Sequence, residues 1–422
     1  MKRVLYTIMV MAIMTSTVCC NTAQKTQITT EYVAQETGIE NDVAADLAVE
    51  GKNTVIEEDT LRIKENQPED AGEDTKTDMG IGVYIKESSD LLGTESKALV
   101  EETPLQPPVF GLVDAHADTI TRTLLPQYDA NLYSNSLHVD FKRLQEYGAP
   151  VQVFALWCAD KYVPNAFEYT KSLIDFFEAA LEEHNDIIEL ATSLADMVRN
   201  AGNNKISAIL SIEGGEALMG DINNLDYFYN RGVRIMGLTW NRENELGYGQ
   251  ATSSKEGLKP FGIEVVKRIE ELGMIMDISH INEAGFWDAH NISTRPYMAS
   301  HSNAYAITPH NRNLRDELIA AMVDRGGIIG LALYPEFLSQ NSKPTIDDIM
   351  AHIRHFTELD AVSILGFGSD FDGFNTMPEG ITDISSMKNL GGFIADNFGE
   401  DISAGIMWEN FYDFFVRFYN GT

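Results

Sequence analysis

Short apolar runs recur along the chain and alternate with longer segments whose apolar residues lie three and four positions apart. The eight runs are 109–115, 150–157, 207–212, 233–239, 274–278, 297–300, 327–333 and 363–368. The helical spacing is clearest in 169–184 and 261–272. Alternation of buried strands with helices predicts a parallel sheet, and eight such units in one domain predict a closed (β/α)8 TIM barrel. An open doubly wound sheet is the alternative, but no glycine-rich phosphate fingerprint follows the first run.

The amino terminus has the pattern of a targeting signal. Lys2 and Arg3 precede an apolar stretch over 4–14, and small residues and a Cys19-Cys20 pair follow. The pattern predicts a signal peptide over 1–20 of the bacterial lipoprotein type, with a lipid anchor at Cys20, although Thr17 stands where such signals usually carry Leu. Plain secretion is the alternative. In both cases we expect export, to the bacterial periplasm or the cell surface.

Residues 21–108 differ in composition from the remainder of the chain. They are rich in Glu, Asp, Thr and Gln, poor in aromatics, and show no sustained period of two or 3.6. Such a segment has too little apolar surface to bury and predicts an acidic, solvated spacer. Pro107-Pro108 closes this spacer, and we expect the barrel domain over 109–422.

Charge and cysteine content narrow the function classes. The formal net charge of the 422-residue chain is −33, which excludes a nucleic-acid partner because phosphate contacts need clustered Lys and Arg. Cys158 is the only cysteine beyond the predicted signal. An intramolecular disulfide framework is therefore not available to the predicted barrel, in spite of the oxidising destination.

Metal-ligand residue types stand at the ends of five of the eight runs. They are His116 and Asp118 after the first, Glu213 after the third, His280 after the fifth, His301 after the sixth, and Asp370 after the eighth. In a barrel these strand ends meet at one mouth, so three imidazoles and three carboxylates would lie close together. Carboxylates crowded in a partly buried pocket repel each other unless cations neutralise them. Nitrogen and oxygen ligands without thiolate suit two zinc ions, with manganese, cobalt or iron as alternatives.

Three further segments resemble a known family in sequence and order. They are Ser-His-Ser-Asn-Ala at 300–304, Arg-Asn-Leu-Arg-Asp at 312–316, and Gly-Phe-Gly-Ser-Asp-Phe-Asp-Gly at 366–373. Together with the strand-end residues, they resemble the renal or membrane dipeptidases, which are binuclear zinc peptidases with bacterial members. The likeness runs from about residue 109 to the carboxyl end.

The resemblance implies roles for the strand-end residues. His116 and Asp118 would bind one zinc ion, His280 and His301 the other, and Glu213 would bridge both. Asp370 would lie beside the first metal as ligand and proton shuttle, while a hydroxide between the two zinc ions attacks the peptide bond of a dipeptide. The resemblance also implies that substrates with a C-terminal D-residue are accepted, and that the enzyme is a homodimer.

Recognition of the substrate involves one family residue and one departure from the family. Arg312 matches the arginine that holds the free carboxylate of the dipeptide, a task suited to the planar guanidinium fork. After the fourth run, where many members carry a histidine that polarises the substrate carbonyl, this chain has Trp240 and Asn241. We expect both to contact substrate; Asn244 is a further candidate for the polar role.

Two other functions compete with the dipeptidase. One is a binuclear amidohydrolase that acts on N-acyl amino acids or cyclic amides. Glu213 favours the dipeptidase over this alternative, because many such relatives bridge their metals with a carbamylated lysine. The other is a surface binding protein that kept the barrel and lost turnover. A complete set of buried ligands argues against this second alternative, since a decayed site would tolerate replacement of its most costly carboxylates.

Overall fold

The computed structural model describes residues 109–252 and 254–420. Their parallel strands close into a ring in the order β1-β2-β4-β5-β6-β7-β8-β9, and β9 pairs again with β1. The strands are β1 Val113–Ala117, β2 Val151–Trp157, β4 Ile206–Glu213, β5 Val233–Gly237, β6 Ile275–Asp277, β7 Met298–Ala299, β8 Ile328–Leu331 and β9 Leu365–Phe367. Each lies within or overlaps one of the eight apolar runs, so the predicted (β/α)8 barrel is confirmed.

One additional strand lies outside the ring. β3 (Ile188–Leu190) pairs with the first residues of β4, over Ile206 to Ala208. Further along, the same edge of β4 is taken by β5, which pairs with Leu210 to Ile212. β3 therefore extends the sheet locally without entering the barrel.

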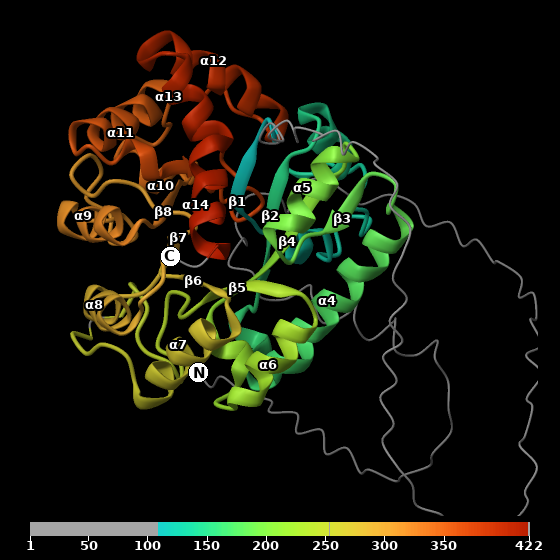
Figure 1. The fold of residues 1–422 in the computed structure, drawn as a ribbon, viewed down its shortest axis with the longest axis vertical. Coiled ribbons are helices and arrows are strands. Elements are labelled where there is room, and N and C mark those ends of the chain that lie inside the picture. The colour runs from blue at the N-terminus through green and yellow to red at the C-terminus, as the bar shows by residue number, and fades with distance from the viewer. Residues whose placement is uncertain (1–108, 253, 421–422) are drawn as a thin grey trace, which may run out of the picture. The chain divides into compact units, whose positions relative to one another are not determined.

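Helices surround the strands and complete the alternating pattern (Figure 1). The longer ones are α4 Ala166–Glu183, α5 Leu194–Gly202, α6 Ile222–Asn230, α7 Pro260–Leu272, α8 Glu283–Ile292, α9 Asp316–Arg325, α11 Ile346–Glu358, α12 Met387–Phe398 and α14 Asn410–Tyr419; the shorter ones are α2 Thr119–Thr123, α3 Phe141–Leu144, α10 Pro335–Leu338 and α13 Glu400–Ala404. The predicted helical segments correspond to α4 and α7. α7 begins with Pro260 and ends at Gly273, whose φ of 68° suits glycine.

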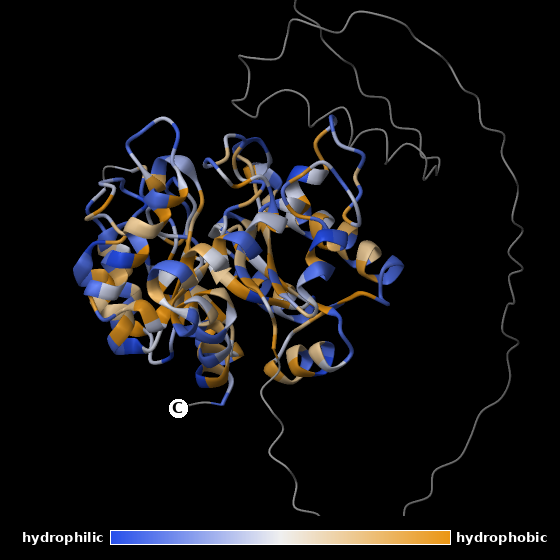
Figure 2. Cartoon of the chain, turned by 90° about the horizontal axis from the view of Figure 1, so that it is seen from above, coloured by the Kyte–Doolittle hydropathy of each residue, from blue (hydrophilic) through white to orange (hydrophobic). Residues whose placement is uncertain are grey.

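The amino-terminal end of the barrel is filled by α14. Phe411, Phe414, Phe415 and Phe418 form one hydrophobic cluster with residues at the starts of the strands. Those strand residues include Val113, Val151, Ile275, Met298 and Ile328. In Figure 2 the central strands carry mostly hydrophobic residues, and hydrophilic ones lie toward the outside. Because α14 closes one end, the polar strand ends can gather only at the other.

Predictions for the amino-terminal segment lie outside the described residues. These are the signal peptide over 1–20, the anchor at Cys20 and the spacer over 21–108. Among the helices of the described ranges, none combines the length and the apolar character that a bilayer crossing requires.

Candidate metal centre

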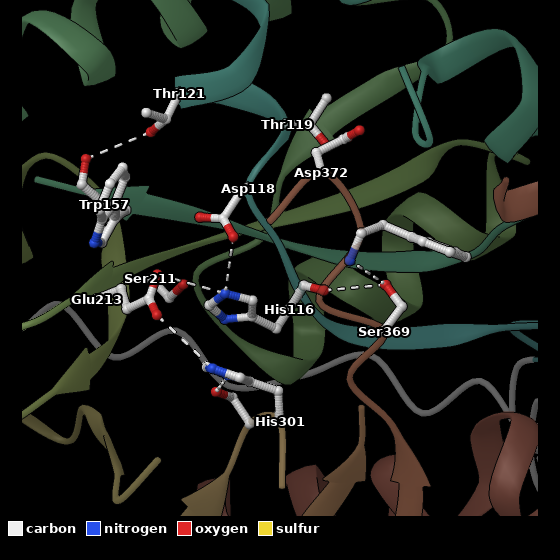
Figure 3. Close-up of polar contacts among 12 residues, drawn as sticks. His116, Asp118, Thr119, Thr121, Trp157, Ser211, Glu213, His301, Ser369 and Asp372 are labelled. Carbon is white, nitrogen blue, oxygen red and sulfur yellow. Dashed lines mark hydrogen bonds and ion pairs between the residues drawn. The ribbon is translucent and has the colours of Figure 1, made fainter. Parts of the chain in front are cut away.

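Glu213 lies at the centre of the predicted ligands, at the carboxyl end of β4. Its Oε2 is 3.5 Å from His116 Nε2. Its other oxygen, Oε1, is 2.9 Å from His280 Nε2 and 3.7 Å from His301 Nε2. Figure 3 shows the His116 ring with contacts to both Asp118 and Glu213, and His301 beside His116 and Glu213 on the side away from Asp118. The two carboxylate oxygens thus face two different sets of imidazoles, as a bridging ligand requires.

The other predicted ligands complete both sides of Glu213. His116 Nε2 is 3.7 Å from Asp118 Oδ2. Ligand atoms of His116, Asp118 and Asp370 all lie within 4.8 Å of one another, and the same holds for His116, Glu213 and His301. His280 Nε2 is 2.8 Å from His301 Nε2. All six predicted ligands are therefore brought together at one mouth.

Unpaired polar atoms indicate that this cluster is built for a cation. His116 Nε2 and Asp118 Oδ1 are buried and have no hydrogen-bond partner, an uncommon state for buried polar atoms. A Cβ at Gly373 would come within 2.4 Å of Asp370 Oδ1 and 2.7 Å of Asp118 Oδ2, so the glycine leaves room for both carboxylates. Nitrogen and oxygen donors without sulfur fit zinc or a similar divalent ion.

The electrostatics of the cluster lead to the same conclusion. Burial, together with the charge of Asp118, raises the pKa of Glu213 well above its usual value, and burial raises the pKa of Asp370 to about 7. Burial lowers the pKa of His116, but Glu213 and Asp118 outweigh it and raise that pKa to about 10. Crowded carboxylates of this kind are stabilised when a divalent cation replaces the protons they hold.

Two of the histidines stay neutral in this environment. Burial lowers the pKa of His280 and of His301 well below the usual histidine value, and the positive charges of Arg312 and His116 contribute to both shifts. A neutral imidazole keeps a lone pair on one ring nitrogen, and that lone pair is what a metal ion binds.

Arg312 lies beside the metal ligands with a free donor. Its side chain is 5% exposed, and its Nη2 donates to the carbonyl oxygen of His301 at 3.2 Å. Its Nε is buried without a partner, and its guanidinium lies over the Phe337 ring. Burial lowers its pKa to about 10, so it remains charged at neutral pH. This placement is compatible with the predicted contact to a substrate carboxylate.

Trp240 and Asn241 also reach the centre. The Trp240 ring packs at 5.1 Å from the Trp157 ring and 6.2 Å from the His280 ring. Asn241 Oδ1 is 2.9 Å from His280 Nδ1. Asn244, in contrast, donates to Leu238 O and accepts two backbone N–H groups. Its amide is thus used within its own loop, whereas Trp240 and Asn241 contact His280.

Sequence reasoning missed the buried acidic residues behind the ligands. Asp114 accepts hydrogen bonds from the backbone N–H and the hydroxyl of Ser369, at 2.7 and 2.8 Å, and so holds the residue before Asp370. Asp372 accepts from the Thr119 hydroxyl at 2.6 Å, next to Asp118. Asp114 and Asp277 stand inside buried strands. Their position within apolar runs could have identified them from the sequence, because a buried carboxylate needs hydrogen-bond partners.

The sequence of residues 104–416 matches the membrane dipeptidase family, peptidase family M19. The chain belongs to this family. The predicted family and the predicted class of enzyme, a metallo-dipeptidase, are thereby confirmed. Dipeptidase aclJ of Aspergillus oryzae is 31% identical over 265 residues, which is 60% of this chain and 63% of that protein's length.

Solved structures of the family share the barrel. Dipeptidase AC, a metallopeptidase of family M19, is 26% identical with a TM-score of 0.69, and the match covers 74% of this chain and 100% of that one. A metallopeptidase from Rhodobacter sphaeroides, solved with a phosphinate mimic of the dipeptide L-Ala-D-Ala, is 24% identical with a TM-score of 0.68. That match covers 73% of this chain and 99% of the other and supports the fold.

Proposed function

We propose that this chain is a dipeptidase whose centre holds two zinc ions. His116 and Asp118 bind one ion, His280 and His301 the other, Glu213 bridges them, and Asp370 completes the first site. The observation that carries the proposal is the position of Glu213, whose Oε2 faces His116 and whose Oε1 faces His280 and His301. Other divalent transition metals suit the same donors.

The side chains around the centre divide the chemistry among them. When bound, two divalent cations lower the pKa of a water molecule and polarise a carbonyl group, which makes hydroxide available for attack on the peptide bond near neutral pH. Asp370 accepts the proton of this water and passes it to the leaving amine. Asp370 lies within 4.8 Å of the ligand atoms of His116 and Asp118, and a carboxylate in that place can both take and give a proton.

Arg312 accounts for the preference for dipeptides. Its unpartnered Nε and its charge favour a carboxylate, and a substrate that ends just after the scissile bond places its carboxylate there. Trp240 and Asn241 line the remaining side. The Rhodobacter sphaeroides relative was solved with a mimic of L-Ala-D-Ala, so we propose that dipeptides with a C-terminal D-residue are also substrates.

The test is release of amino acids from a panel of L-L and L-D dipeptides, with metal content measured on the same preparation. We expect cleavage that a chelator abolishes and two metals per chain. In Glu213→Gln we expect activity to fall about 100- to 1000-fold, on the order of what one electrostatic group contributes. Two bound metals with cleavage of N-acyl amino acids or cyclic amides alone would identify a different amidohydrolase. Bound metals with tight dipeptide binding and no turnover would indicate a binding protein. A chain that binds no metal would refute the proposal.

We also propose that the chain is exported, is anchored to a membrane through Cys20, and acts as a homodimer. We propose further that the barrel domain over 109–422 folds without the segment before it. A variant that begins at Pro107 is expected to keep the specific activity and the dimeric mass of the mature enzyme but to leave the membrane fraction. Cys20→Ser is expected to leave that fraction with the whole spacer still attached. An inactive, aggregated product of the shorter variant would contradict the domain boundary.

A further inference from the structure

Asp277 connects the two strands that carry the metal-ligand histidines. It is the last residue of β6, and its side chain is buried. Its Oδ1 accepts the backbone N–H of Ser279 and the backbone N–H of Ser300, both at 2.9 Å. These two serines immediately precede His280 and His301. One carboxylate oxygen therefore fixes the backbone on which both imidazoles are mounted.

The second oxygen of Asp277 begins a series of hydrogen bonds between side chains. The Ser300 hydroxyl donates to Asp277 Oδ2 in a short contact. Ser300 Oγ also lies 2.8 Å from His301 Nδ1 and 3.2 Å from Ser279 Oγ. Ser300 and His301 are each 1% exposed. With both side chains enclosed by protein, their hydrogen bonds are determined by the neighbouring groups.

A count of protons determines the direction of these bonds. A serine hydroxyl has one proton to donate, whereas an ionised carboxylate only accepts. Asp277 Oδ1 accepts two backbone N–H groups and Oδ2 accepts the Ser300 hydroxyl, so both oxygens act as acceptors. The single proton of Ser300 is thus committed to Asp277, and toward His301 its oxygen can only accept. His301 Nδ1 must then carry the proton, which leaves the lone pair on Nε2.

We propose that Asp277 and Ser300 are positioning residues that hold His301 in the tautomer with its proton on Nδ1. The free lone pair of His301 Nε2 is then directed toward His280 Nε2, which is 2.8 Å away, and Glu213 Oε1, which is 3.7 Å away. Neither residue contacts the substrate; both act through His301. The inference rests on the proposed metal centre, since the value of the fixed tautomer is that no proton has to move before a cation binds.

Asp277→Asn is expected to reverse the direction of these hydrogen bonds while keeping the shape of the side chain. The amide oxygen takes the two backbone N–H groups, so the NH2 group faces Ser300 and donates to it. Ser300 then turns its proton to His301 Nδ1, and His301 is forced to carry its own proton on Nε2. Nitrogen-15 NMR of the histidine side chains of the metal-depleted full-length chain, with the His301 signals assigned by their loss in His301→Gln, is expected to show Nδ1–H in the native chain and Nε2–H in Asp277→Asn.

Metal affinity gives a second readout and a matched control. Competition with a chromophoric chelator is expected to show zinc binding weakened about 10- to 100-fold in Asp277→Asn and in Ser300→Ala, the usual effect of removing a group that orients a ligand. Ser279→Ala removes an equally buried hydroxyl that bonds Ser300 Oγ and the His301 backbone but not the ring. It is expected to weaken binding less than about threefold, because the ring keeps its acceptor.

Several outcomes would overturn the proposed hydrogen-bond relay, which runs from Asp277 through Ser300 to His301. They are a native chain with Nε2–H on His301, unchanged affinity in Ser300→Ala, or an equal loss in Ser279→Ala. If Asp277→Asn does not fold, Ser300→Ala and Ser279→Ala decide. A native chain that binds no zinc yet carries Nδ1–H would refute the proposed function and leave the relay intact. A native chain that binds two zinc ions, with affinity unchanged in Asp277→Asn and Ser300→Ala, would refute the relay alone.

Discussion

At the scale of single residues, Arg312 combines burial with an unused donor. Its guanidinium is held by the His301 carbonyl and the Phe337 ring, while Nε has no partner. A buried donor without a partner costs free energy, and proteins keep such groups where a ligand satisfies them. The carboxylate end of a dipeptide is the ligand that we assign to it.

We therefore expect Arg312→Lys to impair dipeptides selectively. Lysine keeps the charge but loses the planar fork, and a lost charge-assisted hydrogen bond should lower kcat/KM about 10- to 100-fold, mainly through KM. Steady-state kinetics on a dipeptide and on the matching dipeptide amide provide the comparison. Because the amide lacks the carboxylate, both enzymes should cleave it at similar, low rates. An equal loss on the amide would show that Arg312 has a different role.

The positions of the proposed metal ligands were easier to predict from the sequence than the residues that we propose orient them. His116 and Glu213 directly follow apolar runs and Asp370 comes two residues after one, and the fold brings such positions together. Asp277 and Ser300 are also polar, but their roles depend on which atom each faces across two strands. Spacing along one chain does not contain that information. The loop-bound amide of Asn244 was unpredictable for the same reason.

At the scale of elements, the turn after β9 presents a carboxylate in an unusual backbone conformation. Asp370 has a φ of 61°, a left-handed value that costs free energy for a non-glycine residue. Its backbone N–H bonds the His116 carbonyl, and Ser369 is bound by Asp114. These bonds hold the turn, and Gly373 packs against its carboxylate. The strain is thus located at the proposed proton shuttle.

Gly373→Ala is expected to disturb the centre more than the fold. The added methyl group would come within 2.4 Å of Asp370 Oδ1 and 2.7 Å of Asp118 Oδ2, so both carboxylates must move. We expect zinc affinity and kcat each to fall about tenfold or more, as with other changes that displace ligand-supporting groups.

Gly392→Ala in α12 is the control, since its Cβ meets nothing within 4 Å. That variant should stabilise the fold by about 0.5–1 kcal/mol and leave activity unchanged. Equal effects of the two substitutions on kcat would contradict this prediction.

Element prediction succeeded where burial was continuous along the strand. β2 and β4 are almost wholly buried, and their apolar runs are correspondingly long. β3 has three residues, of which only Ile188 is fully buried, because it lies outside the ring. A strand that short leaves no period to detect. β7, with two residues, was found only because buried neighbours extend its apolar run on both sides.

At the scale of the whole molecule, the excess of acidic groups affects stability through the few that are buried. The chain has 64 acidic and 31 basic residues. Glu216 lies just after β4, and burial raises its pKa to about 7, with a further contribution from the carboxylates of Glu245 and Asp160. Because the folded pKa exceeds the unfolded one, its stabilising contribution is complete below the ordinary glutamate pKa of 4.5 and is lost as the pH rises through about 7.

Glu216→Gln should therefore flatten the dependence of stability on pH. The free energy of unfolding, measured in urea at pH 5 and pH 8 with chelator present, should fall between these values by more in the native chain than in Glu216→Gln. The difference should be at most about 3 kcal/mol, from about 1.4 kcal/mol per pKa unit. Glu182→Gln, at an exposed position, should leave the slope unchanged. A slope unaffected by Glu216→Gln would show that this carboxyl is already ionised at pH 5.

The aromatic helix α14 has a consequence for how the protein is made. Its phenylalanines fill the end of the barrel where the strands begin, and the first strand pairs with the last. The polypeptide must therefore be synthesised as far as β9 before the ring can close, and as far as α14 before its base can be sealed. Until the ring closes, the nascent chain has unpaired strand edges. For the export that we propose, the order of the elements thus keeps the barrel open while its earlier strands are made, and a barrel that has not closed can still be threaded through a secretion channel.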